Sequence, residues 1–402
     1  MRIHSPYRNI DWDSFRSHRT ELHCHTCASD GKADFSEMIE AYYEAGYDCL
    51  AITDHGIVDR GWTEPNFRPL RKIFTFQKRP FRKPTGLTEE RLREIGEGAG
   101  RGGRGMLRVP FGTEHSPGGN QWAHVCSWFG DTPSAAMGKA DYTKALRRAD
   151  SAGALCVINH PTSSMKNGEK PYAQVYEGKH ASYVQKLRRL LEKYPSLLGI
   201  EQRGDYDRKL WDILLRHFAP MGRNVFAMGS TDTHDVKGIE DGVGWVEAMM
   251  PENTVAHFRK CLEDGAFFAA SRYVSFIPTP ELLAACPGLP EMTAAHPSLL
   301  LKMREDQLDK FRFLYGEDFY FNHRPIEKPM PAVTKITAED GVISIETQNC
   351  DVILWISDGK IIASGDAIVL AGCEGLGAYV RAELWGPGGN LYTQPFLLQY
   401  EK

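Results

Sequence analysis

Short apolar runs alternate with helix-like patterns over the first 270 residues of the chain. The apolar runs predict strands at 47–53, 154–158, 198–201, 225–228 and 266–270. Apolar residues that recur every three or four positions predict helices at 33–46, 88–95, 142–152, 180–194, 208–218 and 253–264, with Thr88 and Asn253 as N-caps. Strands that alternate with helices are typical of an α/β fold.

The period changes near residue 332, where short alternating runs replace the helical patterns. Seven strands are predicted at 334–337, 342–347, 352–356, 360–363, 367–370, 377–384 and 391–398. Asp340-Gly341 and Asp358-Gly359 indicate hairpin turns. We therefore expect a main α/β domain at 1–275, a Pro-rich linker or packing segment at 276–330, and a small all-β sandwich at 331–402.

Two histidines near the N-terminus carry the first sign of chemistry. His23 and His25 stand two residues apart, the spacing at which a β-strand directs both side chains to one face. Asp30 follows in the loop after this strand. Two imidazoles and a nearby carboxylate form half of a metal site.

Further residues of the same kind follow in order at the ends of later strands. They are His55, Glu114, His124, His160, Asp232 and His234. We prefer His124 to His115 because His124 begins an apolar run, whereas His115 leads into a turn. Open α/β and barrel folds build their sites at the carboxyl ends of strands, so these residues are expected to converge.

Composition and charge narrow the class of protein. The chain has 402 residues, a net charge of −4 and ordinary contents of apolar and charged residues, which excludes a globally basic nucleic-acid binder. No N-terminal apolar segment and no run of transmembrane length is visible, so we expect a cytoplasmic protein without a membrane partner.

The nine cysteines are scattered, which indicates reduced core residues and no disulfide framework. Cys24 and Cys27 could be half of a zinc knuckle, but no second C-x-x-C completes it, so we interpret them as structural.

The ordered motifs resemble the PHP (polymerase and histidinol phosphatase) family over residues 19–275. The matching stretches are H-C-H-T-C-A-S-D-G, T-D-H, G-T-E, His124, N-H-P and S-T-D-T-H. The resemblance implies a distorted (β/α)7 barrel with a two- or three-metal centre, and all nine ligand positions of that family are filled. The C-terminal stretch resembles the β-domain that follows PHP domains in some stand-alone bacterial phosphoesterases.

Six imidazoles and three carboxylates exceed the needs of one metal ion. They suit two or three divalent ions, Zn, Mn or Fe, with a bridging hydroxide that attacks a phosphoester. The resemblance groups His23, His25, Glu114 and Asp232 around one ion, Asp30, His55 and His234 around a second, and His124 and His160 with Glu114 around a third. We place Asp232, His234 and Glu114 in the catalytic set.

The expected substrate is a small phosphomonoester or a nucleotide-like phosphodiester, with nucleic acid only as a short oligonucleotide. Arg203 and Arg60 are candidates for contacts to its phosphate, because both follow strand ends near the site. The basic insertion at about 57–110 is either a solvated segment or a lid that presents cations to an anionic substrate.

Two other functions compete with phosphoester hydrolysis. An amidohydrolase also opens with H-x-H, but it would need a bridging lysine on a middle strand, where this chain has G-T-E. A non-catalytic, metal-containing scaffold would use the β-domain for docking. Oligomerisation through the β-domain is compatible with either kind of protein.

Overall fold

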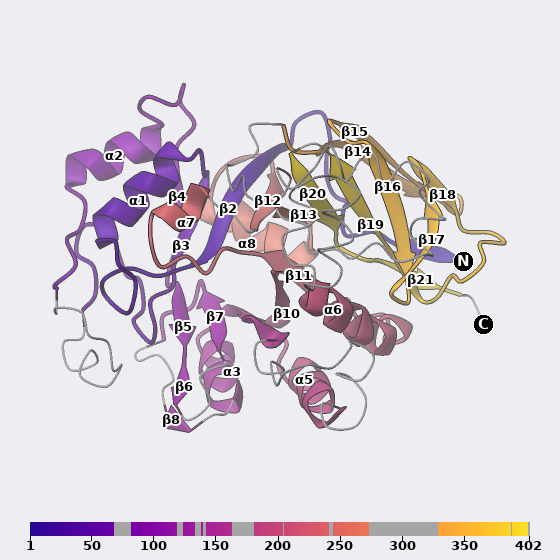
Figure 1. Ribbon diagram of the computed structural model, residues 1–402, viewed down its shortest axis with the longest axis horizontal. Coiled ribbons are helices and arrows are strands. Elements are labelled where there is room, and N and C mark those ends of the chain that lie inside the picture. The colour runs from indigo at the N-terminus through magenta and orange to yellow at the C-terminus, as the bar shows by residue number, and fades with distance from the viewer. Residues whose placement is uncertain are drawn as a thin grey trace, which may run out of the picture.

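The chain folds into a mixed α/β structure in which two sheets carry most of the strands. The structure, a computed structural model, describes residues 1–67, 82–118, 124–132, 138–139, 142–162, 181–203, 205–240, 244–272, 329–386 and 388–400. The all-β C-terminal region lies at one end of the molecule, and the first strand pairs with the last, so both chain ends lie there (Figure 1). None of the helices in these residues is both long and apolar enough to span a membrane.

The largest sheet has eleven strands and joins the two halves of the sequence. Its main path runs through β1 (Arg2–His4), β21 (Phe396–Gln399), β19 (Tyr379–Gly386), β20 (Gly389–Thr393), β13 (Phe267–Ser271), β12 (Trp245–Met250), β2 (Arg16–Cys24), β3 (Cys49–Ile52) and β4 (Leu107–Arg108). A branch adds β16 (Val352–Ser357) and β17 (Lys360–Ser364) beside β19. Only the pairs β2–β3 and β3–β4 are parallel.

A second sheet of five strands faces the ends of β2 and β3. Its order is β11 (Phe226–Gly229), β10 (Leu197–Gln202), β9 (Leu155–Ile158), β7 (Val125–Trp128) and β5 (Thr113–His115). Isolated bridges between Cys24 and Thr233 and between His55 and Glu114 connect the two sheets at both edges. Smaller sheets consist of β14 (Ala332–Glu339), β15 (Val342–Gln348) and β18 (Ala367–Val369), and of β6 (Pro117–Gly118) and β8 (Gly138–Lys139).

The strands β2, β3, β5, β7, β9, β10 and β11 do not all repeat one parallel strand-and-helix unit. β9, β10 and β11 are parallel to one another, but β7 runs antiparallel to both β5 and β9. The connection between β5 and β7 comprises only residues 116–124, which is too short for the crossover that a parallel neighbour requires. The chain therefore reverses at this point, which departs from the regular alternation of parallel strands and helices expected for a (β/α)7 barrel.

The helices lie outside these sheets. They are α1 (Phe35–Glu44), α2 (Glu89–Glu97), α3 (Tyr142–Ser151), α5 (Ala181–Lys193), α6 (Asp205–Phe218), α7 (Lys237–Glu240) and α8 (Val255–Asp264), with a 3-10 helix, η4, at Ala219–Met221. In Figure 1, α3, α5 and α6 lie on one side of the five-stranded sheet, against which they pack.

Of the two N-caps predicted from the sequence, the structure confirms one and contradicts the other. Thr88 caps α2 as predicted, because its side chain accepts the N–H of Arg91. The cap of α8 is Thr254, whose hydroxyl accepts the N–H of His257, and the prediction of Asn253 was wrong. The side chain of Asn253 instead donates to the carbonyls of Asp48 and Gly105 at 2.8 and 3.2 Å, and so links α8 to two loops.

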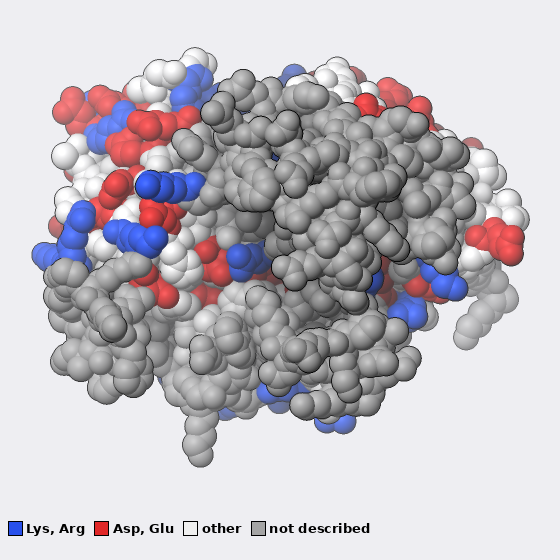
Figure 2. Space-filling view, viewed as in Figure 1, with Lys and Arg blue, Asp and Glu red and all other residues white. Residues whose placement is uncertain are grey.

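Six arginines in the described part of the basic insertion are paired with carboxylates. Figure 2 shows basic and acidic side chains intermixed over the corner that α1 and α2 form in Figure 1. The ion pairs are Arg60–Asp131, Arg82–Asp34, Arg91–Glu40, Arg101–Asp48, Arg104–Asp48 and Arg108–Asp59. These arginines thus serve the packing of the insertion. The basic residues between 68 and 81, on which the lid interpretation also depends, lie outside the described residues.

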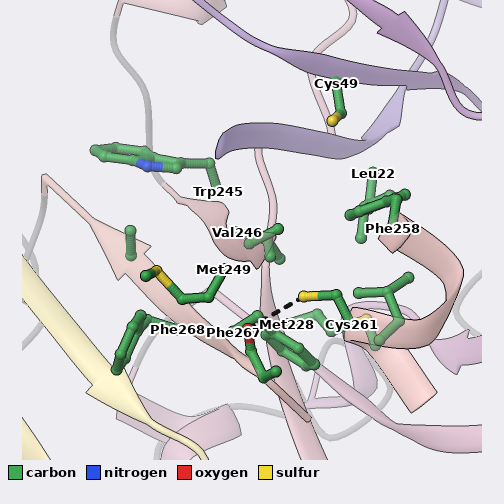
Figure 3. Close-up of a cluster of buried hydrophobic side chains, with 14 of the residues drawn as sticks. Leu22, Cys49, Met228, Trp245, Val246, Met249, Phe258, Cys261, Phe267 and Phe268 are labelled. Atoms are coloured by element: carbon green, nitrogen blue, oxygen red, sulfur yellow. Dashed lines mark hydrogen bonds between the residues drawn. The ribbon is translucent and has the colours of Figure 1, made fainter. Parts of the chain in front are cut away.

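A buried apolar cluster joins the central sheet to α8 (Figure 3). Leu22 comes from β2, and β12 contributes Trp245, Val246 and Met249. Phe267 and Phe268 come from β13, and Phe258 and Cys261 from α8. Each such side chain contributes about 1.5–3 kcal/mol when fully buried. The cluster holds β2, which carries His23 and leads to His25, against the rest of the sheet.

Strands occur in all seven stretches predicted for the C-terminal region. The last stretch is split into β20 and β21 at Gln394-Pro395. Both predicted Asp-Gly turns have positive φ at their two central residues, 50° and 75° at Asp340-Gly341 and 51° and 75° at Asp358-Gly359, as a type I′ hairpin requires. β20 pairs with β13, so hydrogen bonding continues from the α/β part into this region. Independent folding of residues 331–402 stays a prediction, and the predicted linker lies mostly outside the described residues.

A buried ion pair ties the C-terminal strands to α6. The guanidinium of Arg381 on β19 donates to both carboxylate oxygens of Asp212 at 2.9 and 2.8 Å, and its remaining terminal nitrogen donates to Glu383 at 2.8 Å. Tyr379 adds a hydrogen bond of 2.8 Å to Asp212. The Arg381 side chain is 2% exposed, so its charge depends on these partners.

We expect Asp212→Asn to lower the free energy of unfolding by about 3–5 kcal/mol, because it leaves a buried guanidinium without its main counter-ion. The double variant with Arg381→Met should cost less than the sum of the two single variants. Urea unfolding of the metal-free proteins measures both effects. Lys260→Met, which breaks the exposed pair with Asp264, is the control and should cost no more than about 0.5 kcal/mol. A cost for Asp212→Asn as small as that of the control would contradict the assignment.

Candidate metal centre

The nine residues that the sequence singled out lie in one cluster. His23 belongs to β2 and Glu114 to β5, and the others lie beside the ends of β2, β3, β7, β9 and β11 or in the loop that follows β2. They make up four overlapping groups, within each of which the ligand atoms lie within 4.8 Å of one another. The groups are His25, Asp30, His55 and His234; His23, His160 and Asp232; His23, His25 and Glu114; and His55, Glu114 and His124.

Glu114 occupies the centre of the cluster. One of its carboxylate oxygens lies 2.8 Å from His124 Nδ1 and 3.4 Å from Nε2 of both His23 and His160. The other lies 2.7 Å from His55 Nδ1 and 3.4 Å from His25 Nε2. Burial opposes ionisation, but the imidazoles of His124 and His55 hold the pKa of Glu114 well below its ordinary value. The two oxygens face different histidines, which is the arrangement of a carboxylate able to bridge two ions.

Asp30 gathers three histidines at the more exposed side of the cluster. Its oxygens lie 3.6 Å from His25 Nδ1, 3.3 Å from His55 Nε2 and 3.4 Å from His234 Nε2. Burial works to raise the pKa of Asp30, and the imidazoles of His55 and His234 outweigh it and lower the pKa. The side chain of His234 is 37% exposed, whereas those of His25 and Glu114 are fully buried. The cluster therefore opens toward solvent beside His234.

Asp232 divides its two oxygens between different partners. Oδ1 lies 3.2 Å from Nε2 of both His23 and His25. Oδ2 accepts a hydrogen bond of 2.7 Å from Arg203. With Oδ2 bonded to Arg203, Asp232 offers one oxygen to a metal. Glu114, whose two oxygens both face histidines, is thus a better candidate than Asp232 for a carboxylate that bridges two metal ions.

Two of the nine residues have left-handed backbone conformations. The φ angle is 53° at Asp232 and 28° at His160. Aspartate tolerates this region better than most residues, but histidine at 28° is strained. Such strain persists where surrounding contacts determine the conformation, and it concentrates at functional sites.

Several buried ligand atoms lack a well-formed hydrogen bond and are therefore better placed to bind a metal ion than to bond to each other. Among the described residues, neither Glu114 oxygen, nor Nδ1 of His25, His124 or His160, has a hydrogen bond of good geometry, although all are buried. Bonds of about 2.0–2.2 Å to one ion place its ligand atoms roughly 3–4.4 Å apart, and the ligand atoms of each group lie within 4.8 Å of one another. The set is imidazole and carboxylate without thiolate, which fits divalent zinc, manganese or iron.

The observed groups differ in part from those implied by the family resemblance. Asp30, His55 and His234 lie together as implied, with His25 added to them. His124 and His160 fall into different groups, since His124 joins His55 and His160 joins His23 and Asp232. His160 nevertheless remains 3.4 Å from Glu114, so both histidines border the central carboxylate.

Residues beside these nine take part in structural contacts. His115 Nε2 lies 2.9 Å from Ser127 Oγ, which places it in the β5–β7 pair and outside the four groups. The thiol of Cys24 donates to the carbonyl of Ala51, and that of Cys27 to Asp34. No disulfide joins cysteines within the described part of the chain.

Three buried carboxylates that the sequence analysis did not assign surround the cluster. Asp54 accepts from Thr26 N and Oγ at 2.8 and 2.6 Å, and so fixes the loop between His25 and Asp30. Glu21 accepts from His23 N and from Thr231 Oγ, both at 2.8 Å, and so joins the backbones beside His23 and Asp232. Burial raises the pKa of Glu21 to about 7 despite these donors. In the sequence, Asp54 stands one residue before His55 and Glu21 two residues before His23, and only this closeness to a predicted ligand indicated a role for either acid.

Glu201 is the third of these acids, and no spacing marked it. Its carboxylate lies 2.6 Å from His23 Nδ1 and accepts from the backbone N–H of His160 and from Ser230 Oγ. Burial opposes its ionisation, but His23 lowers the pKa of Glu201 to about 2. Glutamate near the end of an apolar strand was the only signal in the sequence.

The two arginines proposed for phosphate contacts lie in different environments. Arg203 donates to Asp232 at 2.7 Å and therefore borders the cluster directly. Arg60 forms a two-point pair with Asp131 at 3.0 and 2.8 Å, and its side chain is 39% exposed. The structure thus brings Arg203 to the site and engages Arg60 in the packing of the insertion.

Comparison with known proteins finds similarity in solved structures only, since no family model and no curated protein matches the chain. A two-domain protein of Bacteroides vulgatus containing a predicted PHP-like metal-dependent phosphoesterase is similar over 100% of this chain and 91% of its own, with 16% identity and a TM-score of 0.44. The lesion-specific endonuclease EndoQ of Pyrococcus furiosus is similar over 62% of this chain and 56% of its own, with 11% identity and a TM-score of 0.35.

An amidohydrolase of Chromobacterium violaceum is similar over 54% of this chain and 87% of its own, with 16% identity and a TM-score of 0.28. Similarity at these identities and TM-scores does not establish a function, so the functional conclusion depends on the geometry of the nine residues.

Proposed function

We propose that the protein is a metal-dependent hydrolase that cleaves a phosphoester. The observation that carries this proposal is the convergence of six imidazoles and three carboxylates in overlapping groups around Glu114. Overlap matters because His23, His25, His55 and Glu114 each belong to two groups, so ions bound in neighbouring groups would lie side by side. Adjacent divalent ions are the arrangement suited to in-line displacement at phosphorus.

Two or three ions of zinc, manganese or iron would occupy the centre. One would be held by His25, Asp30, His55 and His234, another by His23 and Asp232 with His25 or His160, and a third by Glu114, His124 and a shared histidine. When bound, such ions lower the pKa of a water molecule to near neutrality and polarise the phosphoryl oxygens. The protein supplies the anionic charge, with Glu114 shared between ions and Asp232 serving one.

The substrate approaches from the side of His234, whose side chain is the most exposed of the nine. Arg203 lies beside the cluster, where it donates to Asp232, with a side chain that is 29% exposed. Of its five N–H donors one holds Asp232, and we assign the outward-facing part of the guanidinium to a phosphate oxygen. A small phosphomonoester or a nucleotide-like phosphodiester fits this role, and a nucleic acid only as a short oligonucleotide.

The pairing of strands supports a distorted seven-stranded barrel as the frame of the site. β2, β3, β5, β7, β9, β10 and β11 are linked in that order by ladders and by the two isolated bridges. We infer that residues 331–402 form a sandwich packed on this barrel and available for oligomerisation.

The lack of a disulfide among the described cysteines supports a reducing compartment such as the cytoplasm.

The purified protein is expected to bind two to three divalent ions per chain, because nine ligands exceed what one ion can use. Mass-spectrometric metal analysis after reconstitution and desalting measures this number. Glu114→Ala should reduce the number, since Glu114 belongs to two of the groups. One ion or none in the wild-type protein under metal-replete conditions would contradict the multi-metal centre.

The reconstituted protein is expected to hydrolyse members of a panel of phosphomonoesters and phosphodiesters, and chelation should abolish the activity. Rates with each class separate a monoesterase from a diesterase. Matched carboxylic esters and amides test the alternative of an amidohydrolase. Hydrolysis of amides without hydrolysis of any phosphoester would contradict the proposed function.

Asp232→Asn is expected to reduce phosphoester hydrolysis by at least about 10²–10⁴-fold while the fold remains intact. Asparagine keeps the size of the side chain and tolerates the φ of 53°, but it removes the charge that faces His23 and His25. Steady-state kinetics, circular dichroism and metal content are measured together. Asp264→Asn, on the exposed side of α8, is the matched control and should retain activity. Near-wild-type turnover of Asp232→Asn with full metal occupancy would refute its role.

A further inference from the structure

Among the described strands β2, β3, β5, β7, β9, β10 and β11 around the site, β10 is the one that neither contains a candidate ligand nor has one close to its end in the sequence. It lies between β9, which leads to His160, and β11, which leads to Asp232, and it is parallel to both. Its residues are buried on both faces, as expected for the centre of a parallel sheet. Polar side chains are costly at such a position unless they are fully bonded. Glu201, one residue before the end of β10, is only 1% exposed.

The contacts of Glu201 come from three different parts of the metal centre. Oε1 lies 2.6 Å from Nδ1 of His23, on β2. Oε2 accepts the backbone N–H of His160 at 2.5 Å, just after β9. The hydroxyl of Ser230, which precedes Thr231 and Asp232, donates to Oε1. One buried carboxylate thus bonds to segments that present three of the nine residues.

The contact with His23 determines which of its ring nitrogens carries the proton. An ionised carboxylate can only accept, so His23 Nδ1 must be the N–H that donates to Glu201. The amide nitrogen of Asn159 also lies 2.7 Å from this atom, but it too is a donor, and it can donate to the sulfur of Cys126 at 2.9 Å. With the proton of Nδ1 fixed in this way, Nε2 of His23 is the ring nitrogen that can offer a lone pair to a metal ion; the Asn159 amide nitrogen also lies 3.2 Å from it.

That lone pair points into the centre of the cluster. His23 Nε2 lies 3.1 Å from His25 Nε2, 3.2 Å from Asp232 Oδ1 and 3.4 Å from Glu114. These distances are those of ligands on one ion. The second contact of Glu201 acts on His160, whose φ of 28° is strained and is held by the bond from its N–H.

We propose that Glu201 is a positioning residue of the metal centre, which fixes the Nδ1–H tautomer and orientation of His23 and holds the strained backbone of His160. The proposal rests on the metal centre of the proposed function. A carboxylate that receives the second N–H of a ligating histidine also raises the basicity of the ligand, and loss of such a partner typically weakens metal binding by about 10–100-fold.

Glu201→Gln separates this role from simple packing. Glutamine has nearly the same shape, but it has one acceptor oxygen where Glu201 has two, and it adds an NH2 donor. It can accept from His23 or from His160 N, but not from both through separate oxygens. The other N–H then faces an amide donor, so either the tautomer of His23 or the backbone of His160 must change.

The test measures the affinity of the metal-free protein for Co²⁺ by competition with a chromogenic chelator, with circular dichroism to confirm folding. We expect Glu201→Gln to bind Co²⁺ about 10–100-fold more weakly than the wild-type protein. If that variant fails to fold, Glu201→Asp replaces it, because it withdraws the carboxylate from His23 by one methylene and should also weaken Co²⁺ binding. Unchanged Co²⁺ affinity in the folded variant would overturn the proposal.

Glu383→Gln is the matched control for general destabilisation. Glu383 is also a buried carboxylate, but its partners are Arg208 and Arg381 and it belongs to none of the metal groups. This control should lower stability while Co²⁺ affinity stays within about twofold of the wild-type value. Equal weakening in both variants would show that the affinity reports stability alone, and so would overturn the positioning role.

The test of the positioning role of Glu201 can be distinguished from the test of the proposed phosphoester hydrolysis. Weaker Co²⁺ binding by Glu201→Gln supports the positioning role even if the wild-type protein hydrolyses no phosphoester, in which case only the proposed reaction fails. A wild-type protein that binds no Co²⁺ would overturn the metal centre and the role of Glu201 together.

Discussion

The structure depends on the burial of three carboxylates and six imidazoles at one place. Each buried ionised group loses several kcal/mol of hydration unless opposite charges replace it. In the metal-free protein, the pKa values of His55 and His234 are raised, so protons on these imidazoles supply part of this charge. Burial lowers the pKa of His55, for example, but Glu114 and Asp30 outweigh it and raise the pKa to about 10. Divalent ions would replace these protons, so metal binding and protonation compete for the same nitrogen atoms. The cluster is therefore complete only when cations of one kind or the other are present.

Strand geometry explains how so many ligands can reach one point. The carboxyl ends of β2, β3, β9 and β11 meet at one edge, and the bridges Cys24–Thr233 and His55–Glu114 close the gaps between the two sheets there. A second layer then fixes the orientation of the ligands, since Glu21, Asp54 and Glu201 bond to backbone or ring N–H groups beside them. Arg203 acts in the same way on Asp232, and in doing so it leaves one aspartate oxygen for a metal.

The sequence allowed the candidate ligands to be predicted because each lies in or close to an apolar run, which His124 begins and most of the others follow. Positions that depend on contacts between distant segments could not be found in this way. β12 was missed because Trp245–Met250 is buried on both faces and shows no alternation. The reversal at β7 follows from the length of one connection, and the role of Asn253 follows from two carbonyls on other loops. Glu201 is defined by three partners on three segments, and no local pattern records them.

The C-terminal strands belong to the scaffold of the site as much as to a separate region. Gln394, between β20 and β21, both donates to the carbonyl of Ala227 and accepts from its N–H, at 2.8 and 3.0 Å. These bonds satisfy the outer edge of β11, where a further strand would otherwise be needed. β11 leads directly to Asp232, and α6, which Arg381 holds through Asp212, begins just after Arg203. The two charged residues at the rim of the metal centre thus extend from elements that the C-terminal strands hold in place.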